Sequence, residues 1–312
     1  MKIAIIGAGN VGATIAYTLA TQGVASDVSL IDVNTDKAYG EVLDIAHGGA
    51  VSEHVLLRAE GYEGLEDADI IVHAAGRGRK PGESRLDLAK GNIKITEGII
   101  SKIKKHYNGR SIFLVVTNPM DVLTYVFYKQ MGIDRTKIFG SGTVLDSSRF
   151  KYLLGHHFNI DPRNLHAMVI GEHGDSSVPL WSAATIGPTL ISQYPSKEQP
   201  RLSAEDMEII SKDVVQAGQE VIKRKGATFY AISMSVTRII KAIVSNENRL
   251  LCVSSYIENT HGVNDVCLSL PAIIGRDGIR ELLTISLSPS EEAALQRSAA
   301  VLKDMLREVE YQ

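Results

Sequence analysis

The first 32 residues contain the feature that most constrains the fold. An apolar run from Lys2 to Ile6 leads into a glycine turn, Gly7-Ala8-Gly9-Asn10-Val11-Gly12, and an apolar helical pattern follows. A second apolar run, Val28 to Ile31, ends on Asp32. A strand, a glycine turn, a helix, a strand and an acid in this order are typical of a βαβ unit that binds a dinucleotide. A structural glycine turn in another kind of α/β protein is the alternative.

Each glycine of this turn has a separate physical role. Gly7 permits the tight turn, Gly9 lets the backbone approach a pyrophosphate, and Gly12 lets the helix pack closely on the strand. The phosphates would lie on free backbone N–H groups at the helix N-terminus, where the helix dipole favours negative charge. We therefore predict that Gly7, Gly9, Asn10, Val11 and Gly12 bind the cofactor.

Asp32 indicates which dinucleotide is bound. It stands 20 residues after Gly12, at the end of the second strand. There its carboxylate can accept hydrogen bonds from the hydroxyls of the adenosine ribose, and it would repel a 2′-phosphate. NAD is therefore the predicted cofactor, in preference to NADP.

The composition excludes several classes of protein. A length of 312 residues suggests two domains, and a net charge of −3 gives no reason to expect nucleic-acid or membrane binding. The first strand follows Met1 almost at once, which leaves no room for a signal peptide, and no apolar run approaches the ~20 residues of a membrane span. The two cysteines, Cys252 and Cys267, form neither a disulfide framework nor a zinc site. We expect a cytoplasmic protein without a metal site.

The order of the elements predicts two different halves. In residues 1–141 we expect strands at 2–6, 28–32, 54–59, 69–74, 112–116 and 137–140, with helices at about 35–47, 84–107 and 121–131. Such alternation predicts an α/β fold, a Rossmann doubly wound parallel sheet with ligands beyond the carboxyl ends of its strands. In residues 142–312 we expect helices at about 145–156, 204–223, 228–245 and 289–309, a strand at 165–170, a loop at 187–203, and antiparallel strands at 250–257 and 266–270. This second half is predicted to be an α+β substrate domain.

Two groups of polar residues follow strands of the first half. The segment Gly76–Arg85 contains three arginines, three glycines and a proline. Glycines allow movement and arginines bind carboxylates or phosphates through a planar fork, as a lid over an anionic substrate requires. A solvated basic loop is the alternative. Asn118 ends a core strand, where its amide could orient a substrate or a nicotinamide, although taken alone it is more typical of a turn.

Two further groups lie in the second half. Asp146 and Arg149 are three residues apart and so share one helix face, where such a pair is usually a surface ion pair. His173 follows an apolar strand and stands between glycines 171 and 174. A histidine is the natural proton donor and acceptor near neutral pH, and it needs a carboxylate to fix its tautomer. Asp146 is the candidate for that carboxylate.

Five segments together resemble the L-lactate/L-malate dehydrogenase superfamily, and the resemblance extends along nearly the whole chain. They are Gly-Ala-Gly-Asn-Val-Gly at 7–12, Lys-Pro-Gly-Glu-Ser-Arg-Leu-Asp-Leu at 80–88, Val-Thr-Asn-Pro-Met-Asp at 116–121, Gly-Thr-Val-Leu-Asp-Ser-Ser-Arg-Phe at 142–150, and Gly-Glu-His-Gly-Asp-Ser-Ser-Val-Pro at 171–179. The resemblance implies hydride transfer between NAD and a 2-hydroxy acid. It implies that His173 is the general acid and base, with Asp146 as its partner. It further implies that Arg149 binds the substrate carboxylate, and that Arg85 polarises the reacting carbonyl with Asn118 hydrogen-bonding nearby.

The resemblance leaves the substrate open between oxaloacetate/malate and pyruvate/lactate. Malate enzymes of the superfamily carry Arg directly before Lys-Pro-Gly and lactate enzymes carry Gln, and this chain has Arg79. An arginine buried opposite the methyl group of pyruvate would be left unpaired, which costs roughly 3–5 kcal/mol. Glu83 resembles the lactate enzymes, as do Thr228, which would line the substrate pocket, and Ile232, which would pack near the nicotinamide. We predict malate dehydrogenase activity because of Arg79, with L-lactate dehydrogenase as the alternative and a non-catalytic NAD-binding sensor as a remote one.

The resemblance also bears on assembly and regulation. It implies a homotetramer or a dimer, and the absence of an N-terminal arm is typical of the bacterial type. Lys151 and His166 lie where activated bacterial lactate enzymes bind fructose 1,6-bisphosphate at a subunit interface. Those enzymes usually have Arg at the first position, so we favour a solvated lysine and an ordinary histidine over such a site.

Overall fold

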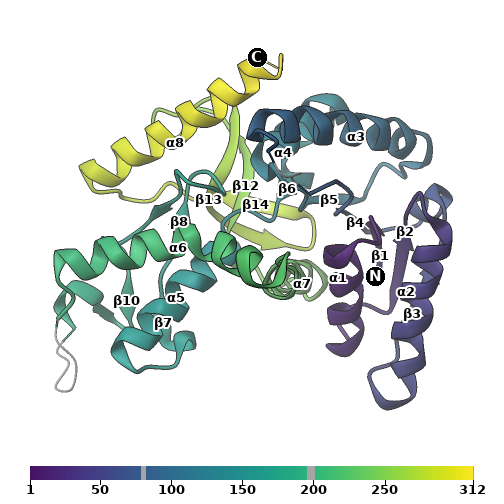
Figure 1. Cartoon of the computed structure of the whole chain (residues 1–312), viewed down its shortest axis with the longest axis horizontal. Helices are drawn as coiled ribbons and strands as arrows, with labels where there is room; N and C mark the ends of the chain where they lie inside the picture. Colours follow the sequence, from purple (N-terminus) through teal and green to yellow (C-terminus); the bar gives the residue numbers. More distant parts are fainter. Residues whose placement is uncertain (79–81, 195–200, 312) are drawn as a thin grey trace.

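A nine-stranded sheet forms the centre of the protein (Figure 1). The computed structural model describes residues 1–78, 82–194 and 201–311. Six strands pair in parallel and carry the first half of the chain. They are β1 (Lys2–Ile6), β2 (Asp27–Ile31), β3 (Leu56–Ala59), β4 (Ile70–His73), β5 (Ile112–Val115) and β6 (Ile138–Gly140). Their order is β6-β5-β4-β1-β2-β3, so the chain reverses direction across the sheet beside β1, where a doubly wound sheet binds its ligand.

Antiparallel strands of the second half extend the same sheet. Strands β12 (Arg249–Ile257), β13 (Val266–Gly275) and β14 (Gly278–Leu282) form a meander, and β12 joins β6 through the pair Ser254–Gly140. Strand β14 was not predicted from the sequence, because it begins at a glycine, which is typical of a turn. In the structure, Gly278 has a φ of +103° and forms a tight turn at the start of the strand.

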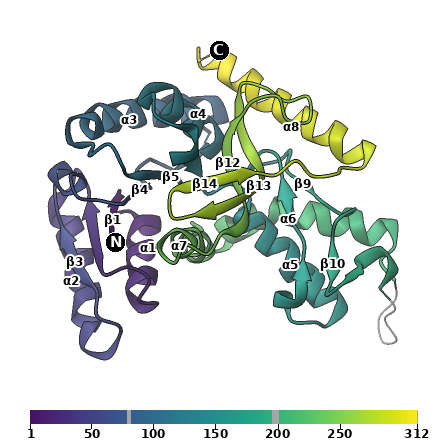
Figure 2. The same cartoon turned by 180° about the vertical axis from the view of Figure 1, so that it is seen from behind.

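Helices cover the two faces of the sheet with separate apolar cores. One core contains buried residues of α3 (Arg85–His106), α4 (Met120–Met131) and α8 (Pro289–Glu308). The other contains those of α1 (Asn10–Thr21), α2 (Thr35–His47) and α7 (Tyr230–Val244). Both views show the two groups on opposite sides, with α7 seen end-on beside α1 (Figures 1 and 2). Each core therefore combines helices from both halves of the chain.

A third core lies at the end of the molecule away from β3. It is formed by α5 (Val144–Phe158), α6 (Ala204–Lys225) and the small sheet of β7 (Leu165–His166), β10 (Thr185–Ile186) and β11 (Thr189–Leu190). The prediction of one strand at 165–170 is wrong. The chain leaves β7 and enters β8 (Val169–Ile170), which pairs instead with β9 (Val178–Pro179). Because Leu165, Ala167, Val169 and Ile170 are all buried, the sequence showed no break there.

The predicted fold class is confirmed by this architecture. The boundary at 141/142 remains a prediction, since the sheet runs across it without interruption. Within the described residues, no helix is both long enough and apolar enough to cross a membrane.

Candidate active site

His173 lies on the turn between β8 and β9, which we call the histidine turn (residues 171–176). Its Nδ1 is 2.6 Å from Oδ2 of Asp146 on α5. A carboxylate can only accept at that distance, so Nδ1 carries the proton and Nε2 is left as the nitrogen that meets a substrate. Asp146 is 4% exposed, so the pair is shielded from water on the carboxylate side.

The carboxylate strongly favours a charged imidazole. The negative charge of Asp146 raises the pKa of His173 from 6.5 to about 9, against the effect of burial. Burial alone would raise the pKa of Asp146, but the charges of His173 and Arg149 outweigh it and the pKa falls below its usual value. At neutral pH the site therefore contains an imidazolium beside an ionised carboxylate, which is the state of a general acid ready to donate.

Arg149 joins the same group from the next turn of α5. Its Nη1 donates to Oδ1 of Asp146 at 3.0 Å, and both side chains are mostly buried. The three-residue spacing thus places the guanidinium and the carboxylate on one helix face, as expected. This is not an ordinary surface pair, because His173 occupies the other oxygen of the carboxylate.

The structure brings most of the predicted substrate residues into one cavity. The cavity has a volume of about 240 Å³, and Asn118, Arg149, His173, Thr228 and Ile232 all line it. These residues come from the end of β5, from α5, from the histidine turn and from the start of α7. Helix α6 adds Val215 and Ile222 to the apolar part of the wall, which also includes Val11, Val116 and Leu145.

Arg85 and Arg77 both form ion pairs, and Asp175, the partner of Arg85, lines this cavity. Arg85, the first residue of α3, donates to Asp175 of the histidine turn at 2.5 Å, and both side chains are half exposed. Arg77 forms a two-point pair with Glu83, at 2.6 and 2.5 Å. The prediction for Arg79 falls outside the described residues.

Sequence reasoning missed a second carboxylate behind His173. Asp121 of α4 is 3% exposed, and its Oδ2 accepts from the backbone N–H of His173 at 2.7 Å. Burial raises the pKa of Asp121 to about 7. A lone acid among the apolar residues of 120–127 was a usable signal, but at a helix start it resembles an ordinary helix-capping residue.

Three of the residues predicted to bind the cofactor line a second cavity, of about 500 Å³. Gly7, Gly9 and Asp32 lie along it, opposite the start of the Gly76–Arg85 segment. Three others line the substrate cavity instead, namely Val11, Asn118 and Ile232. Gly7 has a φ of +112°, and a Cβ on Gly12 would stand 1.8 Å from the carbonyl oxygen of Gly7. By contrast, a Cβ on Gly9 would meet nothing within 4 Å, so the surface at Gly9 is open to a ligand. This backbone cradle fits a dinucleotide, with its pyrophosphate on the N-terminus of α1.

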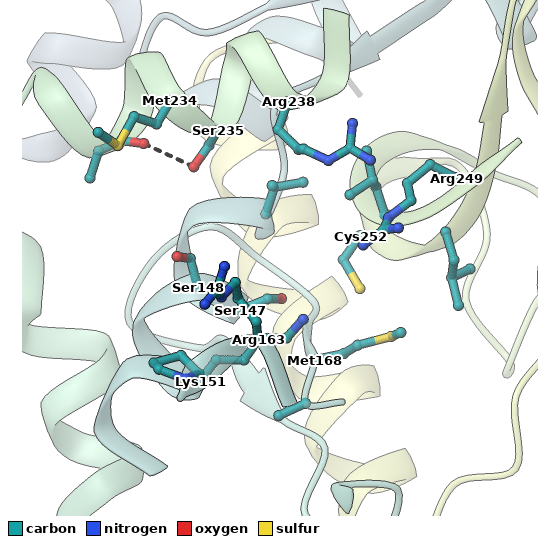
Figure 3. Close-up of a pocket in the computed structure, with 16 residues that line it drawn as sticks. Ser147, Ser148, Lys151, Arg163, Met168, Met234, Ser235, Arg238, Arg249 and Cys252 are labelled. Atoms are coloured by element: carbon teal, nitrogen blue, oxygen red, sulfur yellow. Dashed lines mark hydrogen bonds between the residues drawn. The ribbon is translucent and has the colours of Figure 1, made fainter. Parts of the chain in front are cut away.

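A third, basic pocket lies between α5, α7 and β12 (Figure 3). It has a volume of about 460 Å³, and Lys151, Arg163, Arg238 and Arg249 line it. Burial lowers the pKa of Lys151, and the charge of Arg249 lowers it further. His166 is not among the residues that line this pocket, so the structure does not place it with Lys151 there.

Family models match both halves of the chain. Residues 1–140 match the lactate/malate dehydrogenase NAD binding domain, and residues 143–312 match the lactate/malate dehydrogenase alpha/beta C-terminal domain. The chain belongs to the lactate/malate dehydrogenase family. It is therefore an NAD-binding oxidoreductase, and the predicted cofactor is confirmed.

Several relatives within this family are L-lactate dehydrogenases. The enzyme of Thermoanaerobacter pseudethanolicus is 48% identical, over 99% of each chain. That of Bacillus velezensis is 43% identical, over 98% of this chain and 96% of its own. Among solved structures, the minor L-lactate dehydrogenase of Enterococcus mundtii in its ligands-bound form is 40% identical and superimposes with a TM-score of 0.95, covering 100% of this chain and 99% of its own.

These relatives overturn the malate interpretation drawn from Arg79. The prediction is wrong because it gave one side chain more weight than Glu83, Thr228 and Ile232, which resemble the lactate enzymes.

Proposed function

We propose that the protein is an NAD-dependent L-lactate dehydrogenase, which interconverts pyruvate and L-lactate. The observation that carries this proposal is the contact of His173 with Asp146 at 2.6 Å, next to Arg149 and inside a cavity of about 240 Å³. A proton donor, its orienting carboxylate and a carboxylate-binding guanidinium are what the reduction of a small 2-oxo acid requires. The full-length identity of 43–48% to L-lactate dehydrogenases supports the choice of substrate.

Arg149 is proposed to bind and orient the substrate. Only one of its N–H groups donates to Asp146 in the structure, and a guanidinium has five. The remaining donors would bind the carboxylate of pyruvate as a planar fork. Thr228 and Asn118, which line the same cavity, would then enclose the other end of the substrate.

His173 is proposed to move the proton. When bound, NADH supplies the hydride that reduces the carbonyl carbon of the substrate. The imidazolium donates from Nε2 to the carbonyl oxygen, and the neutral ring retains its Nδ1 proton beside Asp146. Arg85, once released from Asp175, would stabilise negative charge on the same oxygen. In lactate oxidation, neutral His173 takes the hydroxyl proton.

Initial rates with two substrates test this function. We expect the enzyme to oxidise NADH at least ten times faster with pyruvate than with oxaloacetate, both compared as kcat/KM. The comparison with oxaloacetate at the same ionic strength controls for general anion binding. Equal rates, or faster reduction of oxaloacetate, would contradict the proposal.

We also propose that chains associate into a homotetramer, as the resemblance implies. Large apolar side chains on adjoining helices support association, because Tyr17, Tyr39, Tyr152 and Met234 are each more than half exposed. These residues lie on α1, α2, α5 and α7. Light scattering after size-exclusion chromatography measures the mass directly, and a monomeric mass would contradict this.

The basic pocket supports a regulatory test. None of the described residues that line it is acidic, and Lys151 stands near a like charge there. This favours an anion, such as a sugar bisphosphate, as an occupant. We expect fructose 1,6-bisphosphate to lower the KM for pyruvate if the pocket regulates the enzyme. An unchanged KM would remove this proposal and leave the catalytic one intact.

A further inference from the structure

The C-terminal helix contacts the histidine turn through one buried hydroxyl. Ser298 of α8 is 0% exposed, and its Oγ accepts from the backbone N–H of Glu172 at 2.7 Å. The same Oγ is 3.0 Å from Oγ of Ser176 at the other end of the turn. On α8, Ser298 is surrounded by apolar residues, since Leu295, Ala299 and Leu302 are buried in the core. A polar group in such a place is costly unless its hydrogen bonds are satisfied, and here they are.

The turn is shaped to fit this hydroxyl. Gly171 has a φ of +85°, and a Cβ there would stand 2.7 Å from Oγ of Ser298. Ser176 in turn donates from its backbone N–H to the Glu172 carboxylate at 3.2 Å, and its hydroxyl contacts the same oxygen. The hydroxyl of Ser298 thus closes a small ring of hydrogen bonds that includes both sides of His173.

A second element holds the next backbone N–H of the turn. The N–H of Glu172 is bound by Ser298 of α8, and the N–H of His173 is bound by Asp121 of α4. Two consecutive peptide groups are therefore fixed by buried side chains from two different helices. Rotation of the turn about its ends would break one or both contacts, so the direction of the imidazole depends on them.

We propose that Ser298 is a positioning residue for His173, which holds the histidine turn so that the imidazole meets Asp146 and the substrate. The proposal rests on the proposed function for its kinetic consequences. A displacement of the turn by about 1 Å would lengthen the contact between Nδ1 and Asp146, and misplacements of that size cost on the order of 100-fold in rate. It would also weaken the charge coupling that raises the pKa of His173.

The substitution Ser298→Ala tests this role. It leaves the N–H of Glu172 without its acceptor and allows the turn to move. We expect kcat for pyruvate to fall by about tenfold or more, while the KM for NADH stays within about twofold, because the cofactor cavity is untouched. We also expect the pH at which activity is half-lost to shift downward from about 9 toward the ordinary value of 6.5.

Ser111→Ala is the matched control. Ser111 is likewise 0% exposed, and its Oγ donates to the carbonyl of Ala68 at 2.7 Å, before β5 and outside the substrate cavity. It should lower the melting temperature and leave kcat and the pH profile unchanged. If Ser298→Ala behaves in the same way, Ser298 has a structural role only and the proposal is overturned.

Two further measurements keep the test decisive. Should Ser298→Ala fail to fold, Ser176→Ala removes the hydroxyl that contacts both Ser298 and Glu172, and it should shift the pH profile in the same direction by a smaller amount. NMR titration of the His173 ring reports its pKa without turnover. An enzyme that fails to reduce pyruvate would thus refute the proposed function, whereas an unshifted ring pKa in Ser298→Ala would refute the positioning role.

Discussion

The glycine turn (residues 7–12) and the histidine turn each follow the end of a strand, but different contacts fix them. The glycine turn depends mainly on backbone sterics, since Gly7 has a positive φ and a side chain on Gly12 would overlap the carbonyl of Gly7. Its hydrogen bond from the N–H of Ala8 to Asp32, at 2.6 Å, stays within the same βαβ unit. The histidine turn is held by side chains from elsewhere, Asp121 on α4 and Ser298 on α8. The contact of the glycine turn with Asp32 lies within the first 32 residues, whereas the side chains that hold the histidine turn are 52 and 126 residues away along the chain. The glycine turn can consequently be predicted with this contact from a short segment, whereas the residues that hold the histidine turn cannot.

The largest expected effect concerns the imidazole itself. His173→Asn should lower kcat/KM for pyruvate by about 10²- to 10⁴-fold, the usual contribution of a general acid. The dissociation constant for NADH, measured by fluorescence quenching, should not change, because the glycine turn does not depend on this side chain. His106→Asn is the matched control, as His106 pairs with Glu66 at 2.8 Å on the surface. Retained turnover in His173→Asn would remove the catalytic role of this turn.

Alanine substitutions in the glycine turn separate its steric from its binding role. Gly12→Ala should destabilise the fold by about 1–3 kcal/mol or more and abolish NADH binding, because the added carbon would overlap a backbone carbonyl. Gly9→Ala should fold normally and bind NADH about tenfold more weakly, which is ~1.4 kcal/mol. Thermal melts and NADH titrations measure both. Gly40→Ala, in an open position of α2, is the control and should stabilise by about 0.5–1 kcal/mol. Equal melting temperatures for Gly12→Ala and Gly40→Ala would contradict the steric account.

The pH dependence sharpens the contrast, because the histidine turn contains titratable side chains and the glycine turn contains none. Reduction of pyruvate needs protonated His173, so kcat/KM should fall about tenfold per pH unit above about 9. The stability that the charged pair contributes should be complete below pH 6.5 and lost as the pH rises through about 9, because the folded pKa is the raised one. Rate profiles and melts across this range measure both. A break near 6.5 would show that Asp146 does not couple to the ring.

The smallest effect is expected at the rim of the cavity. Asp175→Asn removes the partner of Arg85, and both side chains are half exposed, so the stability should change by less than about 1 kcal/mol. The KM for pyruvate should fall a few-fold at low ionic strength, because Arg85 loses its competing anion, and the difference should vanish at high salt. Asp161→Asn is the control. It frees the exposed Arg163 in the same way and should leave the KM for pyruvate unchanged at low and at high salt. A salt-independent change in KM would indicate a structural cause.

The two turns also show which parts of the fold and of the site could be predicted from the sequence. Periodicity and glycine spacing predict the βαβ unit and the parallel strands. The motifs shared with the dehydrogenase superfamily add the group of His173, Asp146 and Arg149. Asp121 and Ser298 could not be found, because each looks like an ordinary polar residue of its own helix. The break between β7 and β8 was hidden because buried residues lie on both sides of it. The malate error arose in the same way, since one position was judged without its surroundings.

The two halves of the chain share the two apolar cores on the faces of the central sheet, and this affects how the protein folds. A fragment ending near residue 141 would expose the surfaces that α7 and α8 cover in the whole protein, among them the neighbours of Ile15 and Leu123. Such a fragment should aggregate rather than fold, so the chain would emerge from the ribosome with its nucleotide-binding half unfinished until the final helix is synthesised. The twenty residues of α8 would then decide when the enzyme becomes native.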